Sequence, residues 1–205
     1  MTPLPASCER PLLERFLRAE AMAMWAVRAA QLMRPAGTSS RLAVPSHARE
    51  FLRRHEEEEE RHLKEFEALT GQRARQKKSP PRVPGQWHAL AVQLYGYEAL
   101  GLEFARLLAS VRPDLAHIAA DEETHVGFFE REIREILQSG GGPARGAREF
   151  ARAFLRRLPR TVTRYLQGAE LAPFREELAG RILGKIESRF AAVGLLGDAV
   201  TPACT

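Results

Sequence analysis

Cysteine, aromatic residues and long apolar runs are all scarce in this chain. Its 205 residues include only two cysteines, Cys8 and Cys204, and no C-x-x-C pair occurs. These absences exclude a disulfide framework and a thiolate-ligated zinc or rubredoxin-type iron site, and they favour a reducing cytoplasm. The longest apolar stretch, AEAMAMWAVRAAQLM, is interrupted by Glu20 and Arg28, so no segment approaches the roughly 20 apolar residues of a membrane span. The N-terminal residues also lack the basic, apolar and small-residue pattern of a signal peptide.

Positive charge is concentrated in one segment of the chain. The 31 lysines and arginines outnumber the 26 aspartates and glutamates, which gives a net charge of +5. Residues 144–165 contain seven arginines and one glutamate, a net +6, which leaves −1 for the rest of the chain. A uniformly basic nucleic-acid-binding protein is not indicated. The segment predicts an Arg-rich helix that is a solvated face, a membrane-surface helix or a binding site for an anionic partner.

Apolar residues recur at three- and four-residue intervals almost throughout, which predicts an all-α protein. The composition, 44% hydrophobic and 28% charged, is that of one compact domain over residues 1–205. Six helices are expected, over residues 9–33, 46–69, 86–110, 113–138, 144–168 and 170–194, with the fifth kinked at Pro159. Residues 9–138 are expected to form a four-helix bundle, and residues 144–194 two additional C-terminal helices.

The connection between the second and third helices is long. Residues 71–85, GQRARQKKSPPRVPG, are rich in proline, glycine and basic residues. About 15 extended residues span roughly 50 Å, whereas a helix of about 24 residues is only about 36 Å long. The third and fourth helices, in contrast, are joined by a few residues around Arg112 and must be antiparallel. The pattern predicts a four-helix bundle with one long crossover connection.

The most informative stretch is HEEEEERH, residues 55–62. Five successive glutamates on a helix sweep about 400°, so they cannot all face water. The apolar stripe of this helix places His55, Glu59 and His62 on the buried side and leaves Glu57 and Glu60 mostly outside. A buried carboxylate and a buried imidazole are therefore expected three residues apart, in an E-x-x-H pattern.

The fourth helix repeats this pattern, with Glu122 and His125 on its apolar face. The first and third helices each carry one glutamate in an apolar stripe, Glu20 and Glu98, at a similar distance from the adjoining turns. Four desolvated carboxylates would each cost several kcal/mol and repel one another. Two divalent cations would balance their charge, and carboxylate with imidazole suits iron or manganese. The alternative is that the glutamate run of the second helix forms a charged surface, with Glu20 and Glu98 at the edges of the bundle.

With these residues the sequence resembles the ferritin-like diiron-carboxylate superfamily over residues 9–138. The resemblance implies a ferritin-like bundle and a dinuclear iron site, with manganese as the alternative metal. It places Glu20 and His62 beside one ion, Glu98 and His125 beside the other, and Glu59 and Glu122 as bridges. It also implies that Glu58 and Asp121 accept hydrogen bonds from the outer nitrogens of the ligand histidines.

Three further residues near this set have other expected roles. His55, one turn before Glu59, is interpreted as a core or rim histidine rather than a seventh ligand. Tyr95, one turn before Glu98, is a candidate to hydrogen-bond a ligand, with packing as its alternative role. Glu103 is interpreted as a surface or reserve carboxylate beside Arg106.

The surroundings of the site favour one chemistry of this superfamily. The scarcity of cysteine removes the rubredoxin module of rubrerythrins, and the two extra helices depart from a minimal ferritin. We therefore expect a diiron oxidoreductase, a monooxygenase or oxidase that uses O2, a small organic substrate and an external electron donor. EERHL and DETH resemble motifs of demethoxyubiquinone hydroxylases, although the 24-residue spacing from Glu98 to Glu122 is short for them.

Other functions remain open at this point. One alternative is an iron-binding ferroxidase without an organic substrate. A second is a tRNA-modifying diiron hydroxylase, and a third is a metal-free helical interaction module that binds through the Arg-rich helix. A cytoplasmic protein, peripheral to a membrane if the Arg-rich helix binds lipid, and a homodimer are compatible with the sequence.

Overall fold

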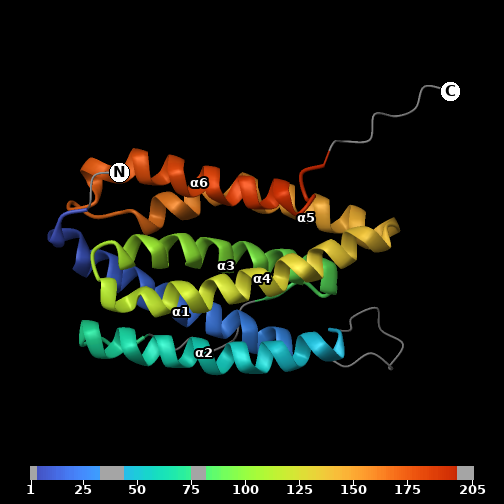
Figure 1. Ribbon diagram of the computed structural model, residues 1–205, viewed down its shortest axis with the longest axis horizontal. Coiled ribbons are helices and arrows are strands. Elements are labelled where there is room, and N and C mark those ends of the chain that lie inside the picture. Colours follow the sequence, from blue (N-terminus) through green and yellow to red (C-terminus); the bar gives the residue numbers. More distant parts are fainter. Residues whose placement is uncertain (1–3, 33–43, 75–81, 198–205) are drawn as a thin grey trace.

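The computed structural model describes residues 4–32, 44–74 and 82–197, and the regular elements in these ranges are all helices (Figure 1). This confirms the predicted all-α class. The long helices are α1 (Glu9–Gln31), α2 (Ser46–Thr70), α3 (Trp87–Ala109), α4 (Ala116–Ser139), α5 (Gly141–Tyr165) and α6 (Arg175–Ala192). Short 3-10 turns precede α1, α4 and α6, at Ala6–Cys8, Pro113–Leu115 and Ala172–Phe174.

The helix ends lie within three residues of their predicted positions except at the start of the last helix, and two of the differences have a clear local cause. Three successive glycines predicted a break before residue 144, yet α5 begins at Gly141. The chain turns at Gly140 and Gly141, whose φ angles of 68° and 61° favour glycine. The last helix begins at Arg175 rather than at residue 170, because the turn containing Pro173 comes first. Pro159 lies inside α5, and the helix continues past it.

The first four helices form two antiparallel pairs, α1 with α2 and α3 with α4. In Figure 1, α2 and α3 run in the same direction, so the end of α2 and the start of α3 lie at opposite ends of the bundle. Residues 71–86 therefore join opposite ends, as the length of this connection predicted.

Helix α3 is the most enclosed helix, because α1, α4, α5 and α6 all pack against it. Helices α5 and α6 lie on the side of the bundle away from α2 (Figure 1). Close packing with α5 depends on Gly96: a Cβ atom there would lie 2.3 Å from the Phe154 ring. Enclosure on several sides explains why α3 is apolar nearly all round, and it makes the buried Glu98 an exception that needs compensation.

The Arg-rich helix is α5. Its residues Ala147, Ala151, Leu158 and Val162 are buried, whereas six of its seven arginines are exposed. The seventh, Arg148, is half-buried and donates to the carbonyl of Gly194 at 3.3 Å. Among the described residues, no helix is long and apolar enough to cross a membrane.

Candidate metal centre

The four bundle helices bring all six predicted ligands together in the interior. Each is at most 3% exposed, and the set is Glu20 of α1, Glu59 and His62 of α2, Glu98 of α3, and Glu122 and His125 of α4. The E-x-x-H spacing places the glutamate and histidine of α2 on one helix face, and the same holds for α4. The six side chains therefore lie at one level of the bundle, as expected.

The side chains form two neighbouring groups. The histidine-rich group contains His55, Glu59, Glu98 and His125, and the carboxylate-rich group contains Glu20, Glu59, His62 and Glu122. Within each group one potential ligand atom per residue lies within 4.8 Å of the others. Glu59 belongs to both groups, as expected of a bridge, whereas Glu122 belongs to one.

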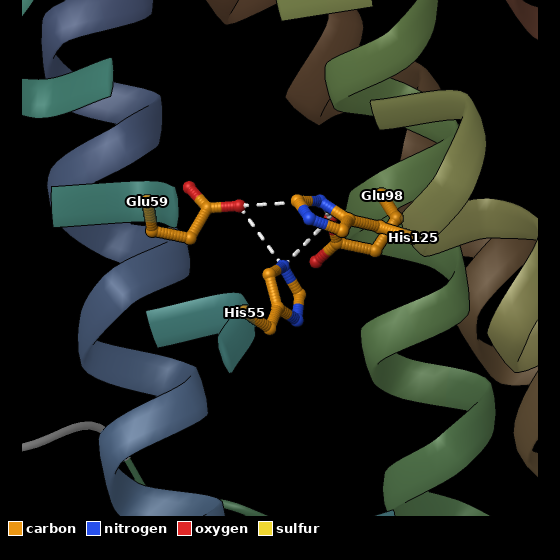
Figure 2. A group of neighbouring side chains, drawn as sticks. All are labelled: His55, Glu59, Glu98 and His125. Atoms are coloured by element: carbon orange, nitrogen blue, oxygen red, sulfur yellow. Dashed lines mark hydrogen bonds and ion pairs between the residues drawn. The ribbon is translucent and has the colours of Figure 1, made fainter. Parts of the chain in front are cut away.

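Figure 2 shows the histidine-rich group, with side chains from α2, α3 and α4 pointing toward one another. His55 Nε2 lies 2.9 Å from Glu59 Oε1 and 3.3 Å from Glu98 Oε2. His125 Nδ1 lies 3.4 Å from Glu98 Oε2 and 3.7 Å from Glu59 Oε1. Two imidazole nitrogens and two carboxylates therefore converge on one point.

Two of the histidines are oriented by carboxylates outside the groups. His62 Nε2 donates to Asp121 Oδ2 at 3.0 Å, and His125 Nε2 donates to Glu58 Oε2 at 2.7 Å. A carboxylate only accepts, so each Nε2 carries the proton and, in the neutral ring, Nδ1 keeps a lone pair that faces the groups. Glu58 and Asp121 thus lie where the sequence expected them, and each connects α2 with α4.

His55 is a core histidine, as expected, and its ring also lies beside two of the predicted ligands. It is fully buried, and its ring centroid lies 3.9 Å from that of His125. The signal was its position four residues before Glu59, on the same helix face. That spacing indicates burial, but it does not show that Nε2 points at the carboxylates.

Burial and mutual repulsion distribute protons unevenly over these groups. Burial and the Glu59 charge raise the pKa of Glu20 well above its ordinary value, and burial with Glu59 and Glu98 does the same for the pKa of Glu122. Burial alone would lower the pKa of His55, but the carboxylates of Glu98 and Glu59 outweigh it and raise that pKa to about 10. Protons on these three residues offset the carboxylate charge when no cation is bound.

Glu59 and Glu98 carry the negative charge that balances His55. Burial acts to raise both pKa values, but the pKa of Glu59 is lowered by hydrogen bonds with Glu20 and His55. The pKa of Glu98 is lowered first by the charge of His55 and then by the neighbouring His125 ring. Both shifts favour the ionised carboxylate, which is the form that binds a cation.

The hydrogen bonding of the groups is incomplete. Within the described residues, six buried side-chain polar atoms have no hydrogen-bond partner, and all six belong to the two groups: Glu20 Oε2, His55 Nδ1, Glu59 Oε2, His62 Nδ1, Glu98 Oε1 and His125 Nδ1. Leaving such an atom unpaired costs about 1–3 kcal/mol. The donor set, four carboxylates and three imidazoles, fits two divalent cations of the iron or manganese type.

Gly101 of α3 leaves space for one of these carboxylates. A Cβ atom at this position would lie 2.7 Å from Glu122 Oε2. The helix backbone of α3 therefore approaches the carboxylate closely, and a larger residue at position 101 would require the Glu122 side chain to move.

Two other residues of α3 lie in surroundings that differ from the expected ones. Tyr95 is buried, but its hydroxyl donates to Glu130 at 3.2 Å and its ring stacks on Phe190 of α6. It thus points away from the ligands and packs against α6. Glu103 is only 5% exposed and accepts from Arg106 at 2.8 Å. Its assignment to the surface was wrong, whereas its expected place beside Arg106 is confirmed.

Comparisons with known proteins identify no relative. No protein-family model matches the chain, and no significant match was found among curated proteins or solved structures.

Proposed function

We propose that this chain is a dinuclear metal oxidoreductase that binds two iron ions, or two manganese ions, between α1, α2, α3 and α4 and uses O2 to oxidise an organic substrate. The observation that carries the proposal is the set of six unpartnered buried atoms, all of which belong to the two groups. Two divalent cations would neutralise the four carboxylates and could give partners to the unpaired atoms other than His55 Nδ1, which lies on the far side of its ring. Structural zinc is disfavoured, because the groups contain no thiolate.

The arrangement of the helices supports a ferritin-like bundle. Parallel α2 and α3 joined by a long connection, with the E, E-x-x-H, E, E-x-x-H order of ligands, is the pattern of ferritin-like di-iron proteins. Helices α5 and α6 are additional to that bundle. The helix arrangement and the set of metal-binding side chains therefore both support a dinuclear metal site.

Bound in its reduced state, the metal pair would supply electrons for the reduction of O2. The protein contributes geometry and a dry environment. Glu59 connects the two groups, and Asp121 and Glu58 hold His62 and His125 with Nδ1 turned inward. The buried apolar side chains around the ligands exclude water from the reaction. Electrons must come from an external donor, because the sequence has no flavin or nicotinamide fingerprint.

An organic substrate is favoured over iron alone by a pocket beside the carboxylates. The pocket has a volume of about 340 Å³ and is lined in part by Glu20, Glu98 and Glu122. This volume lies within the usual range for small-molecule sites. A ferroxidase has no need of such a space, so oxidation of an organic molecule is the function that the site supports best.

The metal content of three variants tests this proposal. We expect Glu122→Ala and His125→Ala each to lose bound iron, because both remove a buried ligand atom. Glu57→Ala should keep the wild-type content, since Glu57 is exposed and pairs only with Arg53, at 2.6 Å. Equal metal content in all three variants would contradict the site assignment.

A further inference from the structure

The pocket beside the metal centre connects the ligands with the protein surface. Its inner end is formed by buried Glu20, Glu98 and Glu122, and its more exposed lining by Tyr97 of α3 and by Thr161, Arg164 and Tyr165 near the end of α5. Between them the walls are mostly apolar side chains of α1 and α3: Phe16, Ala19, Met22, Ala23, Leu100 and Phe104. The pocket therefore has an apolar middle, a ligand-bearing floor and a polar mouth.

Small residues keep this space open. Ala19 and Ala23 of α1 and Gly101 of α3 all line it, and larger side chains at these positions would project into the same volume. At Gly101 even a Cβ atom would come within 2.7 Å of Glu122. Small side chains at these three positions therefore leave room for the pocket.

The cation at the mouth is Arg164. It is exposed, and its guanidinium forms no ion pair with any described residue. Burial, Glu20 and Tyr97 raise the pKa of the Tyr165 phenol, and the charges of Arg164 and Arg18 act in the opposite direction. Charges at both ends of the pocket, the carboxylates inside it and Arg164 at its mouth, therefore act on Tyr165.

We propose that this pocket binds an organic anion, with its apolar body against Phe16 and Phe104, its anionic group on Arg164 and its opposite end at the metal centre. This inference rests on the proposed function, because the far end of the ligand is the part that would be oxidised. Arg164 is the only cationic side chain that lines the pocket in the described part of the chain. An arginine suits carboxylate, sulfate or phosphate groups, which it can bind through two parallel hydrogen bonds.

The placement of charge favours this orientation over the reverse one. Two divalent cations would leave the floor with no net charge, so the floor offers an anion no long-range attraction. The mouth keeps an unpaired positive charge in every state of the metal centre. A ligand with one charged end and one apolar end is therefore best bound with the charge at Arg164 and the apolar end inward.

The test uses octanoate and 1-octanol, titrated by calorimetry into the full chain loaded with manganese. Octanoate should bind the wild type and bind Arg164→Gln about tenfold more weakly, the loss expected for a charge-assisted hydrogen bond. The affinity for 1-octanol should not change. Arg160→Gln is the matched control, since Arg160 is an exposed arginine of the same helix outside the pocket.

A second variant tests the apolar part. Ala19→Phe should fill the pocket and weaken both probes, while manganese content and helical circular dichroism stay at wild-type values. Equal octanoate affinity in the wild type and Arg164→Gln would overturn the inference, as would no octanoate binding to the wild type at millimolar concentration. Manganese is measured in every sample. A chain without manganese contradicts the proposed function, whereas a chain with two ions and no Arg164 effect contradicts only the anion pocket.

Discussion

His62 of α2 donates to Asp121 of α4 across 3.0 Å, and its second ring nitrogen points at the buried carboxylates. The relationship is reciprocal, because His125 of α4 donates in the same way to Glu58 of α2. Each helix thus orients the histidine of the other. We expect Asp121→Ala to lower metal affinity about 10- to 100-fold, the usual effect of losing such a partner. Competition with a metal-binding dye measures the metal affinity of the variant and of the wild type.

The control for this variant is Glu57→Ala, which removes an acidic residue of α2 that does not contact a histidine. Asp121 also accepts from Arg61 at 3.1 Å, so Arg61→Ala separates the two bonds. Unchanged metal affinity in Asp121→Ala, or an equal loss in Arg61→Ala, would show that the hydrogen bond to His62 does not orient a ligand.

His55 gives a second prediction. Its Nε2 atom lies within 3.3 Å of carboxylate oxygens of both Glu59 and Glu98, so His55→Ala should weaken one of the two metal sites. The carboxylate-rich group keeps all its members, and one ion should still bind with wild-type affinity. Stepwise titration with manganese distinguishes the two sites. If both ions bind as in the wild type, His55 has only a packing role.

Metal binding should release protons. The raised pKa values of Glu20, Glu122 and His55 favour the protonated forms of these groups in the metal-free protein, and a cation must displace those protons. Apparent metal affinity should therefore rise with pH and fall as the solution becomes acidic. Titration of manganese into a weakly buffered solution with a pH indicator measures the release. No acidification on binding would contradict this distribution of protons.

The same groups determine how the stability of the metal-free protein changes with pH. The folded, metal-free chain holds protons on Glu20 and Glu122 that the unfolded chain loses above the ordinary pKa of glutamate. Its free energy of unfolding should therefore decrease as the pH rises from that value toward neutrality. Bound metal should remove this dependence, and urea unfolding at several pH values compares the two forms.

Gly101 offers a steric test. In Gly101→Ala the new methyl group would lie 2.7 Å from Glu122 Oε2, so the carboxylate must move and metal affinity should fall. Gly127 of α4 is the matched control, because a Cβ atom there meets nothing within 4 Å. Gly127→Ala should stabilise the helix by about 0.5–1 kcal/mol and leave metal binding unchanged. Equal metal affinity in the two variants would contradict the close approach.

Sequence periodicity was enough to place the six predicted ligands, because each lies on the apolar face of an amphipathic helix. It did not predict what α5 and α6 would cover. Tyr95 lies on α3, and its surroundings are set by Phe190 of α6 rather than by its own helix face. His55 shows the same limit at shorter range, since helical position gives burial but not the direction of a ring nitrogen. The mouth of the pocket depends on where α5 ends, which no local pattern encodes.

The metal content and oxygen reactivity of the purified chain test the central claim most directly. The protein would be reconstituted with Fe(II) without oxygen, freed of excess metal, analysed for iron and then exposed to air while its near-ultraviolet spectrum is followed. The account predicts two irons per chain and an oxo-bridged ferric band that grows with exposure. A folded protein that retains no stoichiometric iron or manganese would contradict it. In that case protons alone would have to neutralise the charge of the buried glutamates.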